Sequence, residues 1–307
     1  MTASGGSGTI RFTTCPQSTH RVPFLWKATL HCILKKTVVA ENTKVLVVEA
    51  PEIASQAKAG QFVILRNEEQ GERYPLTIAD FDPSAGTITL VFLEVGKSTV
   101  RLGRFEVGER IPDIAGPLGN PTHVQKAGTV VCVGGGVGIA AVYPVAKAFH
   151  NAGNHTIGII GAKNKGLLFF EDEMRAACDE LIVTTDDGSR GQKGFVTHRL
   201  LEVVDRLGAR QVAEVYAVGP TIMMKVVADA TRPFGIKTFV SLNPIMVDGT
   251  GMCGGCRVEV GGETKFACVD GPDFDAHLVD FNLLMARQRM YHDHERTAHE
   301  RCRLPKA

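Results

Sequence analysis

The chain has 307 residues, of which 44% are hydrophobic and 22% are charged, and this composition is typical of a globular protein of about two domains rather than of a disordered or collagen-like chain. Its 34 Lys and Arg residues are balanced by 33 Asp and Glu residues, for a formal net charge of +1, so no global positive field favours nucleic acid as a partner. The longest uncharged run, residues 127–146, contains five glycines and Pro144, which favours a buried strand, loop and helix over a membrane span.

Residues 1–32 are expected to form a disordered leader. The first forty residues contain no Asp or Glu and are rich in Ser and Thr, a composition that is also found in transit peptides. We favour the leader because regular hydrophobic patterning begins only near Ile33. No secretory hydrophobic region is present, so we expect a cytoplasmic protein whose eight cysteines are thiols or metal ligands rather than a disulfide framework.

Residues 33–121 are predicted to form a small antiparallel β-barrel. Short β-rich runs at 45–48, 61–65 and 87–93 are separated by turns, which is the spacing of such barrels. Arg73 opens the segment Arg-Tyr-Pro-Leu-Thr, and its planar guanidinium can bridge a pyrophosphate. Ser98, in the segment Gly-Lys-Ser-Thr that follows, can add a hydroxyl donor. Taken alone, an Arg followed by a Pro in a barrel is more often part of a turn than a ligand.

Residues 122–240 are predicted to form an α/β domain with a doubly wound parallel sheet. Apolar strands alternate with helical stretches, and this alternation is typical of that architecture. The strands are expected at 129–133, 156–160, 181–184, 214–218 and 238–242, and the helices at 139–150, 171–179, 196–207 and 221–230.

A glycine-rich turn follows the first strand of this domain. Such a turn lets backbone N–H groups and the next helix approach a pyrophosphate. Ile139 stands where a strict G-x-G-x-x-G motif has its third glycine, so a tight turn without a ligand is an alternative. No Asp or Glu ends the second strand, and Lys163 and Lys165 lie there instead, which leaves the choice between NADH and NADPH open. The glycines are Gly134, Gly135, Gly136 and Gly138.

The most specific motif lies in residues 241–275. Plant-type [2Fe–2S] loops space their ligands C-x₄-C-x₂-C with a distant fourth Cys, and here Asp248, Cys253, Cys256 and Cys268 occupy these positions. The pattern predicts a [2Fe–2S] loop with one carboxylate in place of one thiolate. Two alternatives are a structural zinc site with three Cys and one Asp and a Cys-x-x-Cys redox pair.

Residues 276–307 are expected to form a C-terminal helix and tail. Leu283, Leu284, Arg287 and Tyr291 recur at helical spacing with charged residues between them, which predicts an amphipathic helix. Several histidines lie in this tail, and a metal site there is the less favoured alternative.

The order of these motifs resembles the ferredoxin–NADP reductase superfamily. The resemblance covers roughly residues 33–290 and rests on the Arg-x-Pro-Leu-Thr element, on Gly-Pro-Leu-Gly-Asn-Pro at 116–121, on the glycine turn, on Ala-Val-Gly-Pro at 217–220 and on the cluster loop. Within it, residues 241–272 resemble the small subunits of NADH-dependent reduced ferredoxin:NADP oxidoreductases. The related electron-transfer subunits of dihydroorotate dehydrogenase have four Cys, so Asp248 discriminates between the two branches.

The resemblance implies a FAD-binding barrel at 33–121, an NAD(P)-binding domain at 122–240 and a [2Fe–2S] loop at 241–275. For FAD, the resemblance assigns Arg73, Pro75, Leu76 and Thr77 to the flavin and Gly96, Lys97 and Ser98 to the phosphates. For the nicotinamide dinucleotide, it assigns Gly134, Gly135, Gly136 and Gly138 to the dinucleotide and Gly219 and Pro220 to the nicotinamide. For the cluster, it assigns Asp248, Cys253, Cys256 and Cys268. Pro75, Val137 and Ala141 depart from the Tyr, Thr and Pro that are usual in the superfamily.

The function that the resemblance implies is electron transfer between NAD(P)H, FAD and the cluster, with no general base. Implied partners are a larger flavin and iron–sulfur subunit and ferredoxin. One alternative is electron delivery to dihydroorotate dehydrogenase. Another, of a different class, is a zinc-stabilised nucleotide-binding sensor without catalysis.

Overall fold

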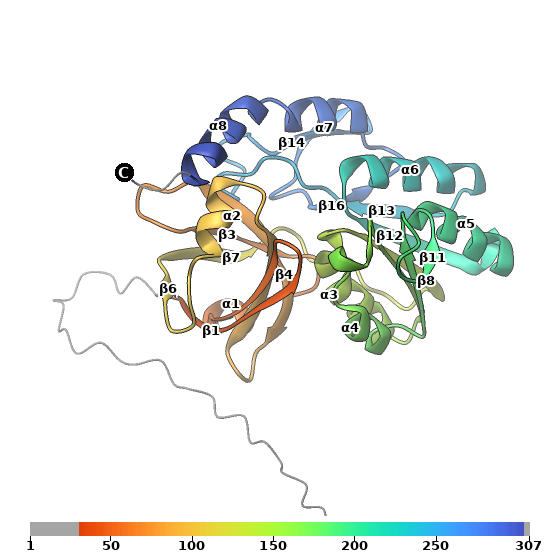
Figure 1. Ribbon diagram of the computed structural model, residues 1–307. Helices are drawn as coiled ribbons and strands as arrows, with labels where there is room; N and C mark the ends of the chain where they lie inside the picture. The colour runs from red at the N-terminus through yellow and green to blue at the C-terminus, as the bar shows by residue number, and fades with distance from the viewer. Residues whose placement is uncertain (1–30, 304–307) are drawn as a thin grey trace, which may run out of the picture.

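The computed structural model describes residues 31–303, so the expected leader lies outside the described residues except for His31 and Cys32. These two residues begin the first strand, two positions before the expected start of the barrel. Figure 1 shows the two β-sheet regions side by side, with the C-terminal helices lying over both.

The first sheet has seven strands in the order β6-β1-β2-β5-β4-β3-β7, and its pairs are antiparallel. Its two edge strands, β6 and β7, are separated in sequence only by Pro112, so the sheet curls back on itself as a near-barrel around an apolar core. The predicted antiparallel barrel is therefore confirmed. Its elements are β1 (His31–Ala40), β2 (Thr43–Glu49), α1 (Pro51–Ala54), β3 (Phe62–Arg66), β4 (Arg73–Asp82), β5 (Thr87–Leu93), α2 (Lys97–Leu102), β6 (Arg110–Ile111) and β7 (Asp113–Leu118).

The second sheet has the order β11-β10-β9-β8-β12-β13-β16, with every pair parallel except β13 with β16. The prediction of a doubly wound sheet is confirmed, with one antiparallel edge strand added. Its elements are β8 (Thr129–Gly135), α3 (Gly138–Asn151), β9 (His155–Ala162), η1 (Lys165–Leu167), α4 (Glu171–Ala176), β10 (Glu180–Thr185), β11 (Gln192–Lys193), α5 (Val196–Leu207), η2 (Ala209–Gln211), β12 (Val212–Val218), α6 (Thr221–Thr231), η3 (Arg232–Phe234), β13 (Thr238–Ser241) and β16 (Asp273–Asp275).

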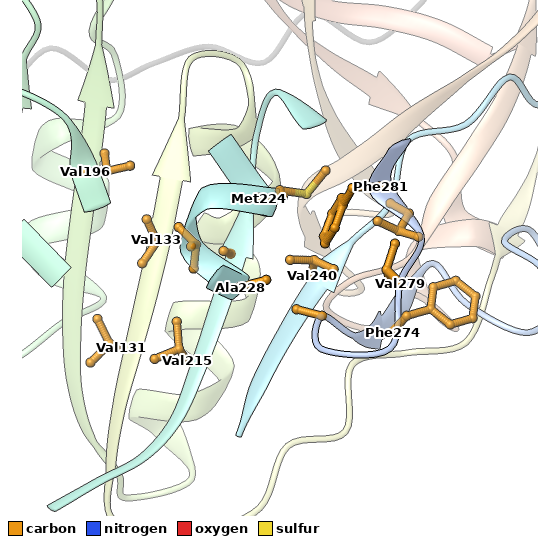
Figure 2. Close-up of a cluster of buried hydrophobic side chains, with 14 of the residues drawn as sticks. Val131, Val133, Val196, Val215, Met224, Ala228, Val240, Phe274, Val279 and Phe281 are labelled. Carbon is orange, nitrogen blue, oxygen red and sulfur yellow. The ribbon is translucent and has the colours of Figure 1, made fainter. Parts of the chain in front are cut away.

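Alternation along the strands of this sheet explains why both faces are covered. On β8, Val131 and Val133 belong to the core cluster that also contains side chains of α5 and α6, whereas Val130 and Cys132 belong to the cluster beneath α3 and α4. Successive side chains of a strand point to opposite faces, so an all-apolar strand needs helices on both sides. Figure 2 shows the first of these clusters, which continues past β13 to the C-terminal segment.

The segment between β13 and β16 contains a hairpin, β14 (Arg257–Val260) with β15 (Glu263–Phe266), that the sequence analysis missed. Gly261 and Gly262 turn the chain with φ of +63° and +81°, as in two-residue hairpins. The chain then returns as β16 and covers the edge of β13, which would otherwise expose unpaired backbone groups.

The C-terminal tail forms two helices, α7 (Phe281–Gln288) and α8 (His292–Arg303), rather than the single helix that was expected. Phe281 and Leu284 anchor α7 in the core, whereas α8 turns toward the barrel, where Arg104 Nη2 donates to the Cys302 carbonyl at 3.2 Å. Figure 1 shows α7 near α6 and α8 near α2. No helix within residues 31–303 has the length and hydrophobicity needed to cross a membrane.

Candidate functional site

The glycine turn lies where the order of the parallel sheet reverses. Strands β9 and β10 follow β8 on one side, whereas β12 and β13 lie on the other, and ligands of such sheets bind at the carboxyl ends of the strands at this switch point. Gly134 pairs with Val218 across β8 and β12. The structure therefore brings the turn at 134–138 beside Gly219 and Pro220, as a shared dinucleotide site requires.

Three of these glycines, Gly134, Gly135 and Gly138, are packed too closely to leave room for a Cβ, and one faces open space. A Cβ on Gly138 would clash with the Val218 carbonyl oxygen, and a Cβ on Gly135 would clash with the Met223 sulfur. Gly136 has a φ of +55° and no heavy atom within 4 Å of its Cβ position. The turn thus fits tightly against β12 and α6 and leaves room on its outer side, an arrangement that suits a pyrophosphate.

The flavin element lies on β4, which pairs with β3. Leu76 pairs with Val63 and Pro75 with Ile64. Arg73 begins the strand and is exposed, and within residues 31–303 no ion pair or side-chain hydrogen bond holds its guanidinium. Arg73 is therefore available to a phosphate, and its planar fork suits one.

The second flavin element, Gly96 to Ser98, meets the first through Glu72, a residue that the sequence analysis missed. Ser98 Oγ donates to Glu72 Oε2 at 2.5 Å, and Lys97 Nζ lies 3.4 Å from Glu72 Oε1. Gly96 caps α2 and has no heavy atom within 4 Å of its Cβ position. The structure therefore brings the two elements to one end of the barrel and leaves open space beside the start of α2, so these residues fit a FAD phosphate group.

The loop that begins at Asp248 wraps the expected cluster position. Asp248 accepts hydrogen bonds from the backbone N–H groups of Thr250, at 3.0 Å, and Cys253, at 2.8 Å, and these bonds hold the pKa of its carboxyl below the usual value. Gly249, Gly251 and Gly254 have positive φ, so the loop turns tightly around this position. Arg287 Nη2 donates to the Gly255 carbonyl at 3.2 Å and supports the loop from α7.

Cys256 and Cys268 are buried side by side, with their sulfurs 3.2 Å apart, whereas Cys253 is exposed. Burial, together with the hydrogen bond to Cys256, raises the pKa of the Cys268 thiol to about 12. No group of three or more His, Cys, Asp or Glu side chains within residues 31–303 is gathered around one position. Instead, Cys256 lies with Cys268, and Cys253 lies with Asp248. Two ligand pairs fit a cluster of two irons better than a tetrahedral zinc site.

The cluster loop packs directly on the barrel. A Cβ on Gly249 would lie 2.9 Å from Ile64 Cγ1, and Ile64 is the residue that pairs with Pro75 of the flavin element. Asn120 Nδ2 donates to the Val269 carbonyl at 3.0 Å, and Asn120 N donates to the Gly271 carbonyl at 2.7 Å. One strand, β3, thus separates the loop from the segment of β4 that is expected to bind the flavin.

Comparison with known protein families supports both halves of this site. The family described as "Iron-sulfur cluster binding domain of dihydroorotate dehydrogenase B" matches residues 243–280. The family described as "Oxidoreductase NAD-binding domain" matches residues 132–229. The first match contains all four expected cluster ligands, and the second contains the glycine turn and Gly219.

Similar proteins cover nearly the whole described chain. A dihydroorotate dehydrogenase B electron transfer subunit homolog from Thermotoga maritima is 46% identical over 89% of this chain and 95% of its own length. An electron transfer subunit of dihydroorotate dehydrogenase B from Geobacillus thermodenitrificans is 32% identical over 80% and 95%. A chain of the NADH-dependent reduced ferredoxin-NADP oxidoreductase, solved in work on flavin-based electron bifurcation, is 46% identical, with a TM-score of 0.83 over 90% of this chain and 99% of that chain.

Proposed function

The chain belongs to the family of dihydroorotate dehydrogenase B electron-transfer subunits and their homologues, within the ferredoxin–NADP reductase superfamily. On this premise we propose which of its residues hold the cofactors and between which partners it transfers electrons. It is an electron-transfer subunit with an NAD-binding and an iron–sulfur-binding domain. The family's FAD, [2Fe–2S] cluster and NAD(P)H are its cofactors.

We propose that FAD binds to the barrel at residues 33–121 through two groups of residues. Arg73 would hold the pyrophosphate, while Pro75, Leu76 and Thr77 line the flavin from β4. The phosphates would be held by Gly96, Lys97 and Ser98. For this, the side chains of Lys97 and Ser98 must leave Glu72 and bind phosphate oxygens instead. Two observations support this assignment: within residues 31–303 no ion pair or side-chain hydrogen bond holds the Arg73 guanidinium, and the described residues leave open space at Gly96.

We propose that NAD(P)H binds to the α/β domain at residues 122–240, on the side of the switch point that faces open space. Gly134, Gly135, Gly136 and Gly138 would cradle the dinucleotide, and Gly219 and Pro220 would lie beside the nicotinamide. Bound FAD supplies the conversion of a two-electron hydride transfer into single-electron steps. The chain's own residues orient the donor and exclude water, and we name no acid or base among them.

We propose that the loop at 241–275 holds the [2Fe–2S] cluster through Asp248, Cys253, Cys256 and Cys268. The observation that carries the whole proposal is the packing of this loop on β3, the strand that pairs with the flavin element. Such a loop is useful for electron transfer only if both cofactors are close together. We propose that the chain works in the cytoplasm, where a reducing environment keeps cysteine ligands from forming disulfides.

The finer function that we propose is that of the small subunit of a ferredoxin:NAD(P) oxidoreductase, bound to a larger flavin and iron–sulfur subunit. The 46% identity to the chain of the NADH-dependent reduced ferredoxin-NADP oxidoreductase supports it, as does a carboxylate at position 248. Electron delivery to dihydroorotate dehydrogenase is the second candidate, which the family match at 243–280 favours. Reconstitution with each partner subunit separates the two, because only the true partner should accept electrons from the reduced cluster.

The test of the cofactor assignment is the FAD and iron content of two variants purified anaerobically. We expect Arg73→Ala to lose most of its FAD and to keep its iron, and Cys253→Ala to lose iron and to keep FAD. Arg210→Ala, at an exposed arginine of η2, and Cys302→Ala, at a thiol outside the loop, are matched controls and should keep both. Unchanged cofactor content in Arg73→Ala and Cys253→Ala would refute the assignment.

A further inference from the structure

A buried carboxylate joins the three parts of the molecule that are assigned to the cofactors. Asp273 Oδ1 accepts a hydrogen bond from the Tyr216 hydroxyl at 2.6 Å, and Asp273 Oδ2 accepts one from the Thr122 hydroxyl at 2.6 Å. The three residues are separated by 94 and 57 positions in sequence. We call this group the Asp273 bridge. None of its members was singled out by the sequence analysis.

Thr122, the first residue after the barrel, fixes the end of the bridge that packs against the barrel. Its backbone N–H donates to the Ala59 carbonyl at 2.9 Å, so the residue is tied to the loop that precedes β3. Gly60, with a φ of +85°, lies so close to the Thr122 hydroxyl that a Cβ there would clash with it. The Thr122 side chain is therefore held against the barrel and is not free to follow a moving partner.

Tyr216 fixes the end of the bridge that belongs to the dinucleotide domain. It lies in the middle of β12, three residues before Gly219, and only 1% of its surface is exposed. Its neighbours on β8 and β13 are Cys132 and Phe239. A tyrosine held between two strands has little freedom, so its hydroxyl marks a fixed point of the sheet.

Asp273 fixes the end that belongs to the cluster segment. It begins β16, five residues after Cys268, and pairs with Ser241, which ends β13 and opens that segment. The Leu242 N–H donates to the Pro272 carbonyl at 2.9 Å. Figure 2 shows Phe274, the next residue, packed with Val240 in the core cluster. Both ends of the cluster segment are therefore gathered at Asp273.

The chemistry of the Asp273 bridge indicates that it positions the parts that it joins rather than stabilising the fold. Within residues 31–303 no ion pair is formed with Asp273, and its partners are hydroxyl groups. A carboxylate that is buried without a cation costs desolvation free energy, and burial raises its pKa to about 6. An apolar contact at this junction would stabilise the fold without this desolvation cost. It would not fix the relative orientation of the three residues as two charge-assisted hydrogen bonds do.

We propose that Asp273 is a positioning residue that sets the separation between the cluster loop and the flavin element. It does so by clamping the cluster segment to Thr122, which follows the barrel and is hydrogen-bonded to Ala59 within it, and to Tyr216 of the dinucleotide domain. This inference rests on the proposed function, because it takes the cofactor positions from it. Electron transfer between two centres slows steeply as they separate, so a displaced cluster loop would receive electrons from the flavin more slowly. The bridge thus affects the flavin-to-cluster step and not the hydride step.

The test follows two rates separately in the full cofactor-loaded chain after rapid mixing with NADH or NADPH. Flavin reduction reports the hydride step, and the later absorbance change of the cluster reports the step between the centres. Asp273→Asn and Tyr216→Phe each remove part of the bridge with little change in volume. Asp275→Asn is the matched control, because Asp275 lies on the same strand and, within residues 31–303, its side chain accepts a hydrogen bond only from the nearby His277 N–H, at 2.9 Å.

In both bridge variants we expect flavin reduction within about twofold of the unmodified chain and slowing of cluster reduction on the order of tenfold, with FAD and iron content retained. The control should match the unmodified chain in both rates. Equal rates in all four proteins would overturn the proposal, and so would loss of the cluster from both variants, because the bridge would then serve retention rather than positioning. If the unmodified chain itself shows no reduction of the cluster by the flavin, the proposed function fails instead.

Discussion

At the scale of single residues, the side chain expected to bind a cofactor can also shape the loop in which it lies. Asp248 is the clearest case, because both its oxygens accept backbone N–H groups of its own loop. This arrangement lets the carboxylate shape the loop before any metal is bound, and it competes with direct ligation. An oxygen ligand is harder than a thiolate, so ligation by Asp248 should alter the cluster's reduction potential.

We expect Asp248→Cys to retain a [2Fe–2S] cluster whose reduction potential differs from that of the unmodified chain, since a thiolate would replace an oxygen ligand. A redox titration followed by electron paramagnetic resonance measures the change. Thr250→Ala keeps the backbone donor to Asp248 and serves as the control, with an unchanged potential. An unaltered potential in Asp248→Cys would show that Asp248 only caps the loop.

Gly138 supports a second residue-scale prediction. Gly138→Ala places a methyl group against the Val218 carbonyl oxygen, so the turn must move away from β12. We expect the Michaelis constant for the nicotinamide nucleotide to rise on the order of tenfold, with FAD and iron content unchanged. Gly166→Ala is the control, because its added methyl group would meet only the Asn164 side chain, at 3.2 Å, on an exposed turn. A Gly138→Ala variant with an unchanged Michaelis constant would contradict the placement of the dinucleotide.

At the scale of elements, the sequence predicted the strands and helices that have a regular apolar pattern. It missed the strands that form only by pairing with a distant part of the chain. Strand 87–93 and helix 196–207 agree with β5 and α5 in both bounds, because their apolar patterns are long and regular. Strand β16 could not be predicted, since its three residues carry no pattern and are held by pairing with β13. The hairpin β14–β15 had a usable signal, the Gly261-Gly262 turn between alternating residues.

The same contrast holds for the site. Spacing alone predicted the cluster ligands, which lie within the iron–sulfur family match at 243–280, and the glycine turn, which lies within the NAD-binding match at 132–229. Glu72 and Asp273 were missed because their partners, Ser98 and Tyr216, are 26 and 57 positions away, and no local pattern reports contacts of that kind.

The packing of the cluster loop on the barrel gives a prediction at this scale. Gly249→Val requires a β-branched side chain at a φ of +76° and against Leu118 and Ile64, so we expect the loop to be displaced from β3 and β7. Iron content should fall by at least half, whereas FAD content should be retained. Gly262→Val, at a φ of +81° with open space around it, carries the same backbone strain without the clash. Iron loss that is equal in the two variants would show that strain, and not docking on the barrel, is responsible.

At the scale of the whole molecule, the fold joins two cofactor-binding sheets through the segment that carries the cluster. Helices α7 and α8 extend this connection from α6 to α2 (Figure 1). The Asp273 bridge lies at the centre of this arrangement, and its buried carboxylate should make the stability of the whole chain depend on pH. Glu214 on β12 is the charged group that further raises the pKa of Asp273.

The sign of this dependence follows from the raised pKa. Folding raises the pKa of Asp273 from 3.8 to about 6, so the folded state binds the proton more tightly and stability decreases as pH rises through this interval. The loss amounts to about 3 kcal/mol when complete. Asp273→Asn carries no titrating group there. We therefore expect the melting temperature of the unmodified chain to fall relative to this variant between about pH 4 and about pH 6, as measured by calorimetry. If the difference in melting temperature between the two proteins stayed constant across this pH interval, the burial of an ionised Asp273 would be contradicted.

We propose that the chain passes electrons from a reduced nicotinamide nucleotide through FAD to a [2Fe–2S] cluster. The most direct test is the visible absorption spectrum of the anaerobically purified full chain, recorded before and after addition of NADH and, separately, of NADPH. We expect flavin bands over a broad iron–sulfur absorption, both bleached by one of the two nucleotides, which also identifies the donor. A colourless protein that stays unresponsive after reconstitution with FAD, iron and sulfide would contradict the claim and favour a zinc-bound nucleotide sensor.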